Sequence, residues 1–237
     1  MTLPSRAQHA VLTKCLGITE VFCVVGFSMG GQQAYHWAVL YPDFVKRFIC
    51  ICGSARTSFH NQCFLEGPKS ALLASKDFEN GHYQTTPQHG IRSFGRVYSA
   101  WAYGQTWFRE SQHLYDGLYP DLNAFLHEQW ELPLLKGWDA NDLLTLLRTW
   151  QTGDVSKIRD GGDLNKCLGE IKAKGLIMPS KTDLYFPPED SELEIEYLRG
   201  KGRLVVIDTV WGHMAGGGSN AKDLEFIQTE IRRFLEE

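Results

Sequence analysis

The sequence predicts an α/β fold built on a parallel sheet with an inserted helical cap. Apolar runs typical of buried strands alternate with helical patterns near both ends of the chain. The middle of the chain carries helical patterns with no strand between them, and a glycine-rich turn joins the first strand to the helix after it. With 237 residues, the chain is long enough for one such domain.

Residues 1–60 are predicted to form the first part of this domain. Residues 6–17 carry apolar side chains at helical spacing, and residues 20–26 form a β-branched and aromatic run that is typical of a strand buried on both faces. A helix at 29–40 and a second apolar strand at 46–53 follow. A strand, a helix and a strand at this spacing make a parallel βαβ unit.

Residues 166–237 are predicted to form the second part of the sheet domain. Strands are expected at 174–180 and 203–210, with a helix at 187–198 between them. The final helix, at 222–235, carries apolar residues along one stripe and should pack that stripe against the sheet.

Residues 61–165 are predicted to form the helical cap. They hold five of the seven tryptophans, and residues 139–150 give the clearest helical pattern among them. In open α/β folds ligands bind at the carboxyl ends of the strands, so a cap at that edge would cover the binding site.

The bulk composition favours a soluble, cytoplasmic protein. A net charge of −4 gives no reason to expect nucleic acid or an anionic membrane as a partner. No run of about 18 apolar residues is present, and the first ten residues lack the apolar core of a signal peptide. None of the six cysteines forms a pair with zinc-like spacing, so we expect buried free thiols and no metal site.

A nucleophile motif lies between the first predicted strand and its helix. Gly26, Ser28 and Gly30 form the pattern GxSxG, which in this position predicts a nucleophile elbow, a sharp turn with a strained serine backbone. The flanking glycines are expected to remove side chains that would clash there, and Gly31 to allow close helix packing. The turn would raise the Ser28 hydroxyl above the sheet and aim the Met29 backbone N–H at a developing oxyanion.

The acid and the base that such a serine needs follow the two late strands in the expected order. Asp183 follows the third predicted strand, and His213 follows the fourth. His213 would take the Ser28 proton, and Asp183 would hold the imidazole in the required tautomer. Glu189 and Asp190 compete as the acid, but they lie beyond two prolines and are expected to open the next helix. None of the other seven histidines follows a late strand.

Several segments resemble the homoserine O-acetyltransferase branch of the α/β-hydrolase superfamily. Residues 28–34 are similar to its elbow helix, residues 53–58 to a loop of small residues after the next strand, and residues 138–142 to a cap segment. Residues 183–189 match its acid loop, and residues 212–213 match its histidine loop. The resemblance runs from the first helix to the end of the chain.

This resemblance implies acyl transfer or ester hydrolysis on a small molecule through an acyl-enzyme on Ser28, with no cofactor. An ester or a thioester, such as acetyl-CoA or another acyl-CoA, would supply the acyl group, and an alcohol or water would accept it. Arg96 lies where the family keeps an arginine for the carboxylate of the acceptor, and Arg92 competes for that role.

One departure from the family concerns the acceptor. The histidine loop of the family continues with an acidic residue that helps to hold the amino group of the acceptor, whereas this sequence has Met214. Losing such a charge-assisted contact costs on the order of 1.5–3 kcal/mol. An uncharged or larger ester or alcohol is therefore expected. The sequence also resembles homoserine-acetyltransferase-like hydrolases of filamentous fungi, some of which act in the biosynthesis of toxins.

A second departure concerns the sheet. The family has eight strands with the elbow after the fifth, whereas only one helix precedes the elbow strand here. The loop that gives the family its second oxyanion N–H belongs to the missing part. Residues 20–26 would then form an unpaired apolar edge, which favours association into a homo-oligomer. Three interpretations stay open: a fragment of an active enzyme, a degenerate copy that acts as an inert binding module, or a protein completed by another chain.

Overall fold

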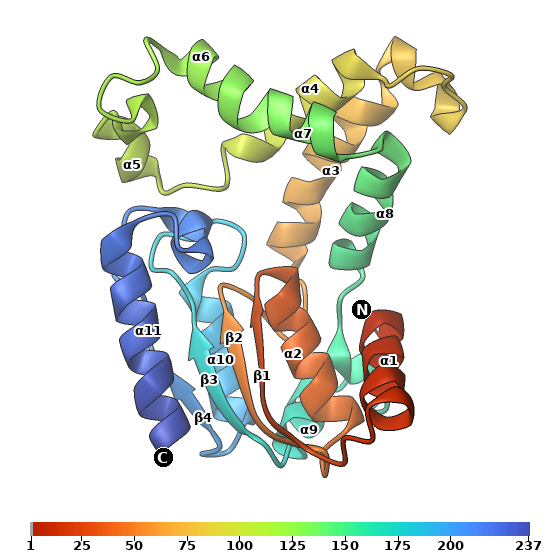
Figure 1. Cartoon of the computed structure of the whole chain (residues 1–237), viewed down its shortest axis with the longest axis vertical. Coiled ribbons are helices and arrows are strands. Elements are labelled where there is room, and N and C mark those ends of the chain that lie inside the picture. The colour runs from red at the N-terminus through yellow and green to blue at the C-terminus, as the bar shows by residue number, and fades with distance from the viewer. Residues whose placement is uncertain (1) are drawn as a thin grey trace.

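The computed structural model describes residues 2–237, and these residues form one parallel sheet of four strands in the order β1-β2-β3-β4 (Figure 1). The strands are β1 (Val21–Phe27), β2 (Val45–Ile51), β3 (Lys174–Met178) and β4 (Gly202–Leu204). Every neighbouring pair is parallel. The predicted α/β fold with a parallel sheet is confirmed.

Side chains of the central strands alternate between two covered faces. On β2, Phe48 and Cys50 pack with the elbow helix α2 (Met29–Leu40), whereas Ile49 and Ile51 pack with the C-terminal helix α11 (Ala221–Glu236). Figure 1 shows α11 on one side of the sheet and α1 and α2 on the other. A strand covered on both faces must be apolar at successive positions, which explains the continuous apolar run Phe48–Ile51 in the second half of β2.

The helices that flank the strands lie close to their predicted ranges. The elbow helix α2 has the bounds expected from the sequence, and α10 (Pro188–Tyr197) separates β3 from β4. The helix expected at 6–17 begins earlier, because α1 (Thr2–Ala10) leads into a π-helical turn over Val11–Cys15. Helix α9 (Leu164–Gly169) precedes β3.

The chain between β2 and α9 forms a helical layer at the carboxyl edge of the sheet (Figure 1). Its core joins Trp107 and Phe125 to Tyr185 and Phe186, which belong to the loop after β3, so the layer packs directly on that loop. The bounds of 61–165 for a separate cap stay a prediction. The helices of this layer are α3 (Phe59–Leu73), α4 (Gln88–Ser99), α5 (Gln105–Arg109), α6 (Leu122–Leu126), α7 (Leu132–Gly137) and α8 (Ala140–Gln151). Short 3-10 or π-helical segments lie at Lys76–Gly81, Gln112–Leu114, His127–Glu131 and Val155–Lys157.

The two outer strands differ from expectation. The first is not buried on both faces, because β1 is the edge of the sheet in the described chain, and Phe22 and Val25 are 56% and 53% exposed. The fourth is regular only over β4, although the N–H of Ile207 still donates to the carbonyl of Pro179 at 2.9 Å. Pro179 follows β3 and has no N–H to donate, which limits the regular ladder at this point.

The structure also tests two expectations drawn from composition, the burial of the cysteines and the lack of a membrane span. All six cysteines are free thiols; Cys50, Cys52 and Cys167 are buried as expected, whereas Cys15 and Cys63 lie exposed at the surface. Burial raises the pKa of the Cys50 and Cys52 thiols well above their usual range, so both stay protonated. No helix within residues 2–237 has the length and apolar character needed to cross a membrane.

One buried carboxyl group joins α10 to the loop after β2. Glu194 is only 2% exposed, and its Oε1 accepts the backbone N–H of Ala55 at 2.6 Å. Burial raises the pKa of Glu194 from its ordinary value of 4.5 to about 8. The neutral acid is therefore the form that the folded protein prefers at moderate pH.

We predict that Glu194 makes folding less favourable as the pH rises. Between pH 4.5 and about 8 the folded protein holds a proton that the unfolded chain has released. The free energy of unfolding should therefore fall across this window, at up to about 1.4 kcal/mol per pH unit. Glu194→Gln keeps the oxygen that accepts from Ala55 and cannot ionise, so this variant should be more stable than the wild type at pH 8 and similar to it near pH 4.

Urea unfolding at several pH values measures this difference. Glu192→Gln is the matched control, since Glu192 is exposed on the same helix, and it should follow the wild type at every pH. A pH-independent difference between Glu194→Gln and the wild type would show that ionisation of this group is not involved.

Candidate active site

Ser28 lies in the turn between β1 and α2, with a backbone that other residues rarely adopt. Its φ of 59° and ψ of −126° put a non-glycine residue at positive φ, which costs free energy unless the surroundings hold it. The Ser28 N–H donates to the carbonyl of Ile51 at 2.9 Å, and the Ser28 carbonyl accepts from Gln32 at 3.2 Å. These bonds to β2 and α2 hold the serine in the strained turn predicted from the motif.

The glycines of the motif differ in how close a side chain at their position would come to neighbouring atoms. A Cβ on Gly26 would overlap the carbonyl group of Gly30, and a Cβ on Gly31 would lie 2.7 Å from the Sγ of Cys50. At Gly30, in contrast, an added Cβ would meet nothing within 4 Å. The turn therefore requires glycine at 26 and close packing requires it at 31, while the expectation that Gly30 also relieves a clash is wrong for the described chain.

His213 lies within a short 3-10 helix, Gly212–Gly217, after the fourth strand, and its ring is hydrogen-bonded on both sides. Its Nε2 lies 2.9 Å from the Ser28 Oγ, and its Nδ1 lies 2.8 Å from the Asp183 Oδ2. The ring is 5% exposed and packs edge to face on Tyr185, with a centroid separation of 4.8 Å. The structure thus brings the three predicted side chains together from three separate loops.

Asp183 is held by the backbone of its own loop. Its Oδ1 accepts the N–H groups of Tyr185 at 2.8 Å and Phe186 at 3.0 Å, which leaves Oδ2 for the imidazole. The side chain is almost fully buried. Of the competing acids, Glu189 and Asp190 lie in the first turn of α10, so the carboxylate that contacts His213 is that of Asp183.

Met29 is the first residue of α2, so its backbone N–H has no acceptor within the helix. A free N–H at a helix start is suited to an anion, because the helix dipole adds to the hydrogen bond. Next to Ser28, this group is available to a negatively charged oxygen of a ligand.

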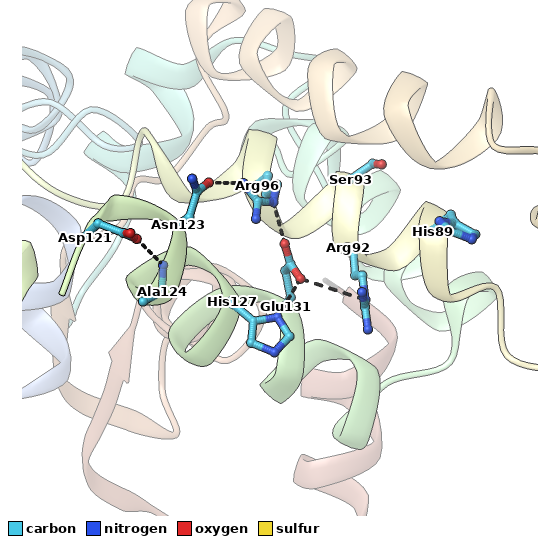
Figure 2. A pocket seen from close by; sticks show the side chains of 9 residues that line it. All are labelled: His89, Arg92, Ser93, Arg96, Asp121, Asn123, Ala124, His127 and Glu131. Carbon is cyan, nitrogen blue, oxygen red and sulfur yellow. Dashed lines mark hydrogen bonds and ion pairs between the residues drawn. The ribbon is translucent and has the colours of Figure 1, made fainter. Parts of the chain in front are cut away.

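The two candidate arginines lie elsewhere, in a pocket lined by α4, α6 and the turn His127–Glu131 of the helical layer (Figure 2). Arg96 donates through Nε to Glu131 and through Nη1 to Asn123 at 3.2 Å, while the Nε of Arg92 lies 3.8 Å from the same glutamate. Neither shares a described hydrogen bond or ion pair with the serine, histidine or aspartate. The structure therefore does not bring Arg96 or Arg92 together with the three predicted catalytic side chains.

Glu131 explains the position of these arginines. Its side chain is only 5% exposed, and His127 contacts it through Nδ1 at 2.9 Å. Burial raises the pKa of Glu131, but the hydrogen bonds from His127 and Arg96 outweigh burial and hold the pKa below its usual value. A buried anion needs its partners, since losing them would leave an uncompensated charge.

A buried thiol beside the three side chains was not predicted from the sequence. The Cys52 Sγ, a carboxylate oxygen of Asp183 and a ring nitrogen of His213 lie within 4.8 Å of one another. The only sequence signal was the position of Cys52 at the end of the second predicted strand. Both imidazole nitrogens already face Ser28 and Asp183, and the Cys52 thiol stays protonated. These donors fit a proton-transfer site better than a metal site.

Comparisons with known proteins agree with this architecture. A family model described as alpha/beta hydrolase fold matches residues 4–78. The chain is 33% identical over 234 residues to the ethyl acetate hydrolase of Pseudomonas veronii, covering 97% of this chain and 65% of that protein. It is 31% identical over 250 residues to the homoserine O-acetyltransferase of Symbiobacterium thermophilum, covering 98% and 63%.

A solved structure is also similar. The acetyl esterase MekB superposes with a TM-score of 0.93 at 33% sequence identity, covering 98% of this chain and 67% of that one. The chain thus spans about two thirds of the length of the relatives and the structure that it matches.

We predict opposite outcomes for two similar substitutions in the elbow. Gly26→Ala should disrupt the turn, because its Cβ has no space beside the Gly30 carbonyl, at a cost of about 1–3 kcal/mol or more. Gly30→Ala should leave stability unchanged or raise it by up to about 1 kcal/mol, since alanine favours a helix and the space is open. Thermal unfolding of both purified variants measures this. Equal losses for both would contradict the geometry of the turn.

Proposed function

This chain belongs to the α/β-hydrolase family, in the branch that holds homoserine O-acetyltransferases and acetyl esterases, and we propose that it hydrolyses an uncharged carboxylic ester through an acyl-enzyme on Ser28. The observation that carries the proposal is the continuous series of hydrogen bonds from the Ser28 hydroxyl through His213 to Asp183. This arrangement is what nucleophilic acyl transfer by serine requires.

In the first half-reaction, the Ser28 Oγ attacks the carbonyl carbon of the ester while its proton passes to the Nε2 of His213. The 2.9 Å separation of these two atoms is within reach for proton transfer. The carbon–oxygen bond to the alcohol then breaks, and the imidazolium returns its proton to the leaving alcohol. Asp183 stabilises the imidazolium through Nδ1 and stays ionised.

In the second half-reaction, water attacks the acyl-enzyme and gives its proton to the same Nε2. Collapse of this intermediate breaks the bond to Ser28, which regains the proton, and releases the carboxylic acid. In both halves the negative charge forms on the former carbonyl oxygen, and the Met29 N–H is the donor in this chain that would stabilise it.

Two observations favour an ester over homoserine as the substrate. Met214 follows His213, so the neighbouring position offers no carboxylate to an ammonium group. Two of the similar proteins are named an ethyl acetate hydrolase and an acetyl esterase. Transfer of the acyl group to an alcohol, as the name of the Symbiobacterium protein implies, is the competing outcome. A role in specialised metabolism stays a prediction.

We predict that a fluorophosphonate probe labels Ser28 and that ethyl acetate is hydrolysed. Ser28→Ala should abolish both. Asp183→Asn should lower kcat on the order of 10⁴-fold, because the imidazole would lose its orienting partner. Asp190→Asn is the matched control, since it removes a carboxylate from the first turn of α10, close in sequence to Asp183, without touching His213, and it should keep normal activity. Intact-mass spectrometry and titration of the released acid measure these outcomes.

If the protein is instead a catalytically inert binding module, neither labelling nor hydrolysis is expected. A folded, monodisperse sample that neither reacts with the probe nor hydrolyses esters would contradict the proposal and favour a binding module. Product formation that requires acetyl-CoA and an alcohol, with no hydrolysis of simple esters, would instead identify a transferase.

A further inference from the structure

An apolar cavity of about 200 Å³ lies in the helical layer, and Met29, the residue after Ser28, is part of its lining. No charged side chain lines it. Met29 forms one wall. Residues of α3, α4, α7 and α8, the turn before α7 and Trp138 between α7 and α8 form the rest. The lining residues that matter for the argument are Met29, Tyr98, Trp130, Leu143, Leu146 and Trp150.

Two aromatic rings, those of Tyr185 and Phe186, connect the wall of this cavity to the catalytic histidine. The rings of Tyr98 and Trp150 pack on Tyr185 with centroid separations of 5.2 and 5.3 Å. The Tyr185 ring packs in turn on His213 at 4.8 Å. Phe186 stacks on Trp150 at 5.2 Å and lies 5.6 Å from the histidine ring. The aromatic wall of the cavity is therefore continuous with the wall that holds the imidazole.

One end of the cavity opens to solvent along α8. Leu143 is 6% exposed, whereas Leu146, one turn further on, is 39% exposed. Trp138, just before α8, is 45% exposed. The cavity is thus buried at one end and open to solvent at the other. It can take a chain whose reactive end stays near Ser28.

Trp150, one of the lining residues, carries a polar group. Its side chain is almost fully buried, and its indole N–H has no hydrogen-bond partner within residues 2–237. A buried donor without a partner costs free energy. A buried donor of this kind among apolar side chains is suited to an oxygen of an ester ligand.

We propose that this cavity holds a hydrocarbon chain of the substrate, so that the protein prefers esters with a linear chain of about six carbons over ethyl acetate. This inference rests on the proposed ester hydrolysis. The size follows from a volume of about 200 Å³ and roughly 30 Å³ per carbon, about the share of one water molecule in the liquid. A charged acceptor would lose its water in this cavity without gaining a partner.

Two series of esters test the proposal and identify which side of the ester enters the cavity. One series lengthens the acyl chain from ethyl acetate to ethyl hexanoate, and the other lengthens the alcohol from ethyl acetate to hexyl acetate. Each buried methylene should raise kcat/KM about fourfold in one of the series. The series in which kcat/KM increases identifies the part of the ester, acyl or alcohol, that the cavity binds. Flat or falling values in both series would overturn the proposal.

A charge at the rim provides a test on the protein side. Leu146→Asp should reduce kcat/KM for the six-carbon ester at least tenfold more than for ethyl acetate, because the carboxylate disfavours an apolar chain. Leu193→Asp is the matched control: Leu193 is similarly exposed, at 44%, but lies on α10 outside the cavity. It should leave both substrates unaffected. Equal effects of the two variants on chain-length preference would contradict the proposal.

A binding measurement separates this inference from the proposed function. Tryptophan fluorescence of Ser28→Ala, titrated with hexyl acetate, ethyl hexanoate and ethyl acetate, reports on the cavity without any reaction. Saturable binding of one six-carbon ester, tighter than that of ethyl acetate, supports the cavity even if the wild type proves inert. If the probe labels Ser28 and ethyl acetate is hydrolysed, but no six-carbon ester binds, the cavity inference is wrong and the proposed function stands.

Discussion

The structure depends on one imidazole that is buried and hydrogen-bonded at both nitrogens. His213 can face Ser28 with one nitrogen and Asp183 with the other only if three loops, far apart in the sequence, meet at the same edge of the sheet. Parallel strands meet this requirement, because all their carboxyl ends lie at one edge. The α/β fold thus brings the three loops to one edge of the sheet, and the loops provide the hydroxyl, imidazole and carboxylate groups.

Each member of this group is held by contacts that are not themselves reactive. The strained Ser28 is fixed by backbone bonds to Ile51 and Gln32, and it fits only because Gly26 has no side chain. Asp183 is fixed by two backbone N–H groups of its own loop. The helical layer then buries Tyr185 and Phe186, the residues that supply those N–H groups, in its core, so the same aromatic cluster shields the imidazole from water and lines the apolar cavity.

The sequence predicted what depends on local pattern and missed what depends on distant partners. Helix α2 has its predicted bounds because a glycine-rich turn starts it and a Tyr-Pro pair follows it. The partners of Arg96 could not be predicted, since Glu131 lies 35 residues away and only the packing of the helical layer brings it near. The exposure of Val25 likewise depends on which strands flank β1, which an apolar run does not reveal. Cys52 lies by Asp183 only after β2 and β3 pair.

The most direct test is the position of the proton on His213. Nitrogen NMR of histidine-labelled protein, assigned with a His213→Gln variant, reports which ring nitrogen carries the proton in the resting protein. The geometry predicts a protonated Nδ1 facing Asp183 and a bare Nε2 facing Ser28, and replacing Asp183 by alanine should destroy this preference. A resting state with the proton on Nε2 would leave Ser28 without a base and contradict the account.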